Sequence, residues 1–68
     1  MEVQALKDYT DEMLSDKDLN PSQKVAALNN WIDRLEIKIF THSLSSEELR
    51  EVIDLMKYMK SERKKLNS

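Results

Sequence analysis

The chain contains no glycine and only one proline in 68 residues. Tight hairpin turns, β-bulges and loops that cradle phosphate all depend on the positive φ angles that glycine adopts at little cost. A chain without glycine therefore has few tight turns available to it. The composition predicts long helices with few connections between them, and it argues against a glycine-rich nucleotide-binding loop.

Capping residues mark two helix starts. Asn20 can cap a helix that has Pro21 at its first position and Gln23 at its third, and Ser45 and Glu48 have the spacing of a capping box. Both signals precede apolar residues at helical spacing. We therefore predict three helices, over about residues 2–15, 21–40 and 46–65, within a single domain spanning residues 1–68.

The apolar residues repeat at steps of three and four, which is the seam of a helix that packs lengthwise against another. The seams are Val3, Leu6, Tyr9 or Thr10, and Met13 in the first helix; Val25, Leu28, Ile32, Leu35 and Ile39 in the second; and Leu49, Val52, Met56, Met59 and Arg63 in the third. The predicted fold is all-α. The second and third helices form a long antiparallel hairpin, and the shorter first helix packs on it.

The core of such a chain is expected to be thin, because a domain of this size buries only about 60% of the surface that its unfolded form exposes. The chain has no cysteine that could form a disulfide. Stability must then come from good helix packing, from self-association or from a partner. This reasoning favours a homodimer, in which Leu55, Tyr58 or Met59 would meet the same residues of a second copy.

Several apolar residues fall outside the seams, and two interpretations of them stay open. The first helix could cover Trp31 and the flank of the third helix, while Ile37 and Phe40 tuck under a connection and the methionines fill the core. Alternatively, these residues form a surface for a partner protein or a second copy, since aromatic anchors dominate interface energetics. The predicted contact residues are Trp31, Ile37, Phe40, Leu55, Tyr58 and Met59.

Charge is distributed unevenly along a chain whose net charge is −2. Residues 1–23 carry six acids and two lysines, whereas the stretch from residue 57 to residue 65 carries five bases and one acid. Basic side chains could neutralise nucleic-acid phosphates, but they also complement the dipole of a helix C-terminus. The candidate nucleic-acid contacts are Lys57, Lys60, Arg63, Lys64 and Lys65.

Catalytic and metal-binding patterns are poorly represented. The single histidine, His42, lies in a polar connection next to Ser43, where sequence neighbours rarely hold the geometry of a nucleophile and its base. Residues 16–20 match the start of a calcium loop, D-x-D-x-N, but Pro21 stands where the loop needs glycine and Ala27 where it needs an acid. We expect no catalytic residues, no metal site and no cofactor.

Neither a membrane span nor a signal-peptide core is evident, so we expect a protein of the cytoplasm, in a cell or in an infected host cell. The length and composition are those of many small helical regulators of bacteria and phages, which is a size class and not a family. The function that the sequence favours is a non-enzymatic interaction module. It would act as a regulator, inhibitor or assembly adaptor by binding a larger protein, as a homodimer. The alternative is a nucleic-acid-associated regulator that uses the basic end of the third helix.

Overall fold

The computed structural model describes residues 3–68 and forms three α-helices, α1 (Val3–Ser15), α2 (Pro21–Thr41) and α3 (Ser46–Leu66). The predicted all-α class and the order of the helices are confirmed. The predicted ends of the helices agree with the observed ones to within one residue. The predicted start of the first helix, at residue 2, lies outside the described residues.

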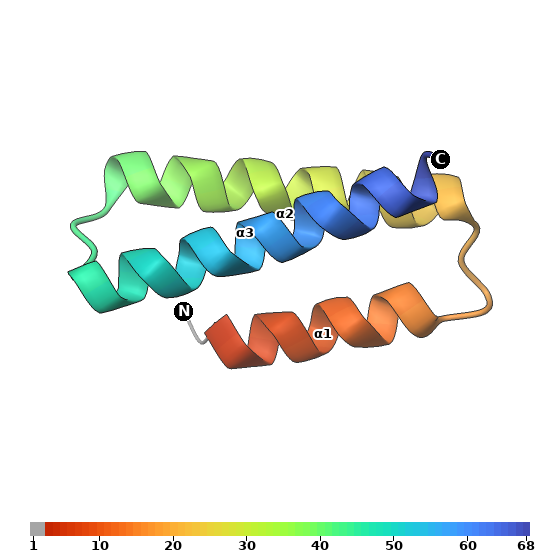
Figure 1. Cartoon of the computed structure of the whole chain (residues 1–68), viewed down its shortest axis with the longest axis horizontal. Coiled ribbons are helices and arrows are strands. Elements are labelled where there is room, and N and C mark those ends of the chain that lie inside the picture. The colour runs from red at the N-terminus through yellow and green to blue at the C-terminus, as the bar shows by residue number, and fades with distance from the viewer. Residues whose placement is uncertain (1–2) are drawn as a thin grey trace.

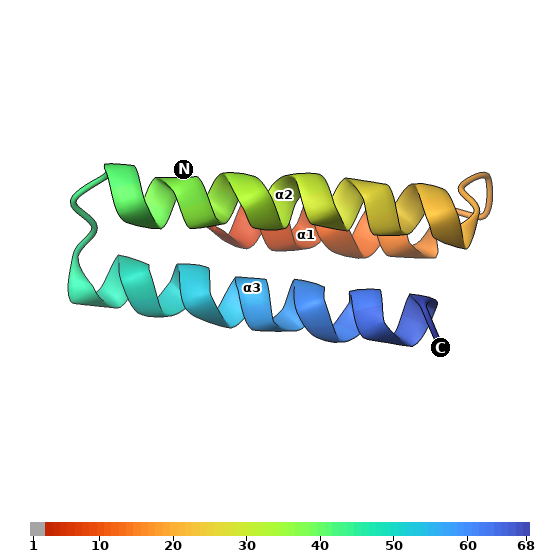
Figure 2. The ribbon, with the colours of Figure 1, turned by 90° about the horizontal axis from the view of Figure 1, so that it is seen from above.

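The helices are arranged as a triangle in cross-section. α2 and α3 run antiparallel and pack closely along their length, and α1 packs on α3 and also contacts α2 (Figure 1). Seen from above, α1 lies behind α2 while α3 stands to one side (Figure 2). α1 therefore covers one flank of the α2–α3 hairpin.

The helix starts are formed by the predicted capping residues. The Asn20 side-chain oxygen accepts a hydrogen bond from the Gln23 backbone N–H at 2.8 Å, and the Gln23 side chain accepts one from the Asn20 backbone N–H at 2.9 Å. The Ser45 hydroxyl oxygen accepts from the Glu48 backbone N–H, but the Glu48 carboxylate accepts from the Ser45 hydroxyl and not from its backbone. Two satisfied N-termini thus set where the hairpin helices begin.

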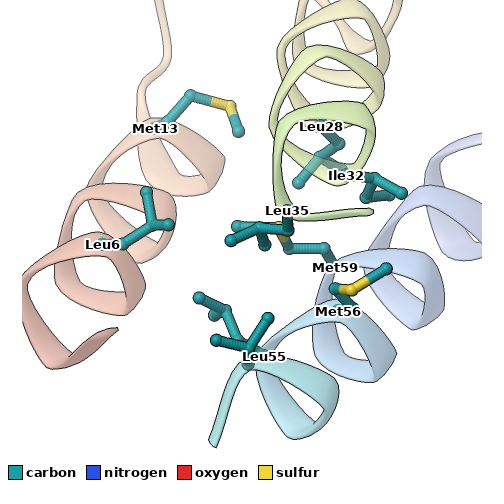
Figure 3. Packing of buried hydrophobic residues seen from close by; sticks show 9 residues of the cluster. Leu6, Met13, Leu28, Ile32, Leu35, Leu55, Met56 and Met59 are labelled. Atoms are coloured by element: carbon teal, nitrogen blue, oxygen red, sulfur yellow. The ribbon is translucent and has the colours of Figure 1, made fainter. Parts of the chain in front are cut away.

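The core lies where the three helices meet. Its buried apolar members are Leu6 and Met13 of α1, Leu28, Ile32 and Leu35 of α2, and Val52, Leu55, Met56 and Met59 of α3 (Figure 3). The seam of α1 continues through Thr10 and not Tyr9. Thr10 is 1% exposed, and its buried hydroxyl is satisfied because it donates to the Leu6 carbonyl, whereas half of the Tyr9 surface stays exposed.

Within residues 3–68, no helix combines the length and the apolar character that a crossing of the bilayer requires.

Candidate protein-binding surface

Within residues 3–68, the most exposed large apolar side chains lie at the C-terminal end of α2. Phe40 is 87% exposed and Ile37 is 61% exposed, and their spacing of three residues makes them neighbours on one stretch of the helix. We call them the Ile37–Phe40 patch. The prediction that the sequence carries apolar side chains its own core does not cover is confirmed for these two residues. The alternative, that they tuck under a connection, is wrong.

The geometry of α2 explains why no part of residues 3–68 covers the patch. Phe40 is nine residues beyond Trp31, which at 100° per residue places it on the opposite side of the helix. α1 packs on the Trp31 side, so it cannot reach Phe40. In the connection to α3, the apolar residue Leu44 packs against the core and not over the patch.

Trp31 belongs to the α1–α2 interface. The Tyr9 ring meets the Trp31 ring edge to face, with centroids 6.2 Å apart and an interplanar angle of 66°. The Arg34 guanidinium lies 5.4 Å from the centroid of the Trp31 ring. Trp31 is half-buried by these contacts, which supports the interpretation that the first helix covers it.

Leu55 and Met59 are core residues, and their predicted role as contacts with a second copy is wrong. Leu55 is 4% exposed and Met59 is fully buried. Leu55 and Met59 are buried because α3 packs against two neighbours, α2 and α1. Figure 3 shows Leu55 and Met59 among the side chains that fill the space between the helices.

Tyr58 connects α3 to α1. Its hydroxyl donates a hydrogen bond to the Asp11 carboxylate, and the Lys7 ammonium pairs with Asp11 at 3.1 Å and lies 5.0 Å from the centre of the Tyr58 ring. The hydrogen bond to Asp11, together with burial, raises the pKa of Tyr58 to about 12. The same hydrogen bond and that from Lys7 lower the pKa of Asp11. Tyr58 therefore stabilises the packing of α1 and is only partly available to a partner.

A shallow hollow of about 300 Å³ opens between α1 and α3 beside this cluster. Val3, Leu55 and Tyr58 line its apolar part, and Lys7 and Asp54 contribute charge. Because Lys7 is already paired with Asp11, the hollow offers apolar surface beside an acidic rim. We assign it no chemistry, since these groups do not converge on one point as a nucleophile and its base would.

The basic residues near the end of α3 separate into two groups. Arg63 donates to the Asn29 side chain at 2.8 Å, and Lys60 and Lys65 lie 3.8 Å and 3.6 Å from the carboxylates of Glu36 and Glu62. These exposed pairs are each worth about 0–1 kcal/mol and can be exchanged for other partners. Lys57 and Lys64 are exposed and have no ion pair within residues 3–68. Lys57, Lys60 and Lys64 share one side of α3, because their spacings are three and four residues.

The polar connections show no catalytic arrangement. The Thr41 hydroxyl donates to the Ile37 carbonyl at 2.7 Å and lies 2.9 Å from His42 Nδ1. In the connection between α1 and α2, the Asp18 backbone N–H donates to the Asp16 carboxylate. Within residues 3–68, histidine and acidic side chains form no cluster that could hold a metal ion.

Ile53 lies to one side of the seam of the third helix in the sequence, but it was not among the predicted contact residues. This side chain is 38% exposed and lies four residues before Lys57 on the same side of α3. The spacing of Ile53, Lys57, Lys60 and Lys64, by four, three and four residues, was present in the sequence as a signal.

Comparison with known proteins adds no relative: no family model, curated protein or solved structure matches the chain.

Proposed function

We propose that this chain is a non-enzymatic interaction module that binds a larger protein through the Ile37–Phe40 patch. The observation that supports this most is the 87% exposure of Phe40 beside the 61% exposure of Ile37. Phenylalanine is a residue type that is enriched in the buried centres of interfaces and depleted from ordinary surfaces. A module of this kind would act in the cytoplasm as a regulator, inhibitor or assembly adaptor.

The two side chains suit an anchoring role. They lie in the last two turns of a helix whose opposite side is packed in the core by Leu35, so their backbone is held in place before any partner arrives. Preorganised anchors lose little conformational entropy on binding. Full burial of a side chain such as Phe40 is worth about 1.5–3 kcal/mol, which is enough to make it an energetic centre of a small interface.

A homodimer stays a prediction, and its basis has changed. Two of its three predicted contacts, Leu55 and Met59, are in the core. A second copy would have to meet the Ile37–Phe40 patch instead, in an isologous contact. The thin core argument for dimerisation is also weaker, because three helices bury a continuous cluster of nine apolar residues within one chain.

Nucleic-acid binding is the less favoured alternative. Three of its five predicted contacts, Lys60, Arg63 and Lys65, have partners within the chain. One of those partners, Glu36, places a negative charge beside the basic residues, where it opposes a phosphate backbone.

The proposal is tested by capture of partners from extracts of the organism that encodes the chain. Wild type, Phe40→Ser and the matched control Asn30→Ser, which changes another exposed position of α2, are immobilised and compared. A protein retained by wild type and by Asn30→Ser but lost from Phe40→Ser supports the proposal. Equal retention by all three variants contradicts it. Sedimentation over a wide range of concentrations shows in parallel whether Phe40 mediates contact with a second copy.

A further inference from the structure

Four residues form a continuous line along one side of α3. Ile53, Lys57, Lys60 and Lys64 follow one another at steps of four, three and four, and all four are exposed. We call this line the α3 stripe. Steps of this kind keep a helix face directed at a second helix that lies lengthwise beside it. The stripe carries three positive charges on a chain whose net charge is −2.

Two side-chain contacts locate the stripe in the bundle. Lys60 lies 3.8 Å from Glu36, and Arg63 donates to Asn29, so this side of α3 adjoins the side of α2 that carries Glu36 and Asn29. α1 packs on the other flank of the hairpin, where it meets Trp31 and Tyr58. The α3 stripe thus borders the flank that no helix within residues 3–68 covers.

Phe40 borders the same flank. It follows Glu36 by four residues on α2, and Ile53 precedes Lys60 by seven residues on α3. Because the two helices are antiparallel, both steps lead toward the connection between them. The uncovered flank therefore has an apolar end near the connection, formed by Phe40 and Ile53. The three lysines follow along the rest of α3 and make that part of the flank basic. Figure 3 shows Ile32 and Met56 between α2 and α3 on the side away from α1.

We propose that this flank docks an amphipathic helix of another protein, with an acidic edge along the α3 stripe and apolar residues over Phe40 and Ile53. The proposal rests on the proposed function and names the partner's chemistry. Lys57 and Lys64 are seven residues apart, which is about 10 Å along the axis of α3. Two acidic residues that are seven positions apart on a partner helix have the same separation. The charges of such an edge are complementary to the three lysines.

A helix fits this flank better than a nucleic acid does. Glu36 stands on the α2 side of the flank, where it repels a backbone of phosphates but can pair with a basic residue of a protein. The side chains of Phe40 and Ile53 are exposed at one end of the flank. The apolar face of a docked amphipathic helix would cover them. Preferential binding of a nucleic acid to this flank would therefore contradict the proposal.

The test uses two labelled helical peptides of about three heptads, each with leucine at two positions of every heptad. The acidic peptide has glutamate beside the leucines, and the basic peptide has lysine at the same positions. Fluorescence anisotropy measures their binding to the full chain, at low and at physiological salt. A short DNA duplex is measured in the same way, and sedimentation of the chain alone reports self-association.

The double variant Lys57→Glu/Lys64→Glu reverses two charges of the stripe. Within residues 3–68, neither lysine forms an ion pair, so the substitutions break none. The control is Lys17→Glu/Lys65→Glu, which makes the same change in net charge at exposed positions away from the stripe and breaks only the exposed pair of Lys65 with Glu62. Circular dichroism confirms that both fold. Phe40→Ser completes the set and tests the apolar end.

We expect the acidic peptide to bind wild type and the control roughly tenfold more tightly than it binds the stripe variant, and more tightly than the basic peptide binds wild type. No binding of the acidic peptide overturns the proposal, as does equal binding of both peptides. Tighter binding of DNA than of the acidic peptide, or self-association lost in the stripe variant, also overturns it. If both peptides bind equally and Phe40→Ser weakens both, the partner chemistry is wrong but the proposed function stands. If Phe40→Ser has no effect on any partner, the proposed function fails.

Discussion

Replacement of Met59 and of Phe40 by alanine separates the core from the binding surface. Met59 is fully buried, so Met59→Ala removes its transfer free energy and leaves a cavity, which together cost about 2–5 kcal/mol. Phe40 is 87% exposed. If full burial of a phenylalanine is worth about 1.5–3 kcal/mol, the remaining contact of Phe40 is worth about 0.2–0.4 kcal/mol. The higher helix propensity of alanine offsets even that small loss.

The two variants should therefore differ strongly although phenylalanine is the larger residue. A domain of this size has a free energy of unfolding of about 3–10 kcal/mol, so Met59→Ala should lower the melting temperature by at least about 8 °C and could unfold the chain. Phe40→Ala should leave it nearly unchanged. Thermal and urea unfolding, followed by circular dichroism and Trp31 fluorescence, measure both. A loss below about 1 kcal/mol for Met59→Ala, or above it for Phe40→Ala, would refute the assignment of these residues.

Three further predictions concern the contacts that hold the helices in place. Because the raised pKa of Tyr58, about 12, exceeds its ordinary value of 10.0, its bond to Asp11 stabilises the fold below pH 10 and is lost as pH rises toward 12. The lowered pKa of Asp11 adds stability that is lost as pH falls below 3.8. Tyr58→Phe should remove the tyrosinate absorbance change near pH 12, and an unaltered titration would contradict the contact. Asn20→Ala should cost about 1 kcal/mol of unfolding free energy while Asn20→Ser costs little, and equal losses in urea unfolding would argue against the cap. Lys24→Met should cost about 1 kcal/mol, because the ammonium donates to the Leu14 carbonyl at the end of α1 at 2.7 Å; hydrogen exchange should quicken in α1 first, and uniform exchange would contradict this.

The hairpin could be predicted from the sequence because its signals are local. Asn20 and Ser45 satisfy backbone donors within three residues of themselves, so the starts of α2 and α3 depend on nothing far away in the chain. Periodicity likewise identified Leu28, Leu35 and Val52 as core residues. These side chains face the other helix of the hairpin wherever α1 packs. These predictions were confirmed because they rest on geometry that one helix already contains.

The assignment of residues beside the seams could not be made in the same way. A helical wheel shows that Leu55 and Ile53 flank the seam of α3 on opposite sides, but it does not say on which side α1 packs. That choice depends on the handedness of the bundle, which neither local propensity nor spacing specifies. α1 packs on the Leu55 side, so Leu55 is buried and Ile53 is left exposed. Thr10 and Tyr9 posed the same problem: α1 packs with Thr10 toward the core, where the hydroxyl is satisfied within its own helix, and Tyr9 lies at the edge.

The packing of α1 also bounds how strongly the uncovered flank can bind. α1 is held by Leu6 and Met13, which are nearly fully buried, whereas the other flank offers the exposed parts of Phe40 and Ile53. Burying those parts is worth about 2–4 kcal/mol, which falls short of the roughly 4–15 kcal/mol that association costs in lost freedom. The lysines of the α3 stripe must supply part of the difference, so docking through this flank should be reversible and weakened by salt. Tight binding that salt leaves unchanged would require an apolar surface that this flank does not have.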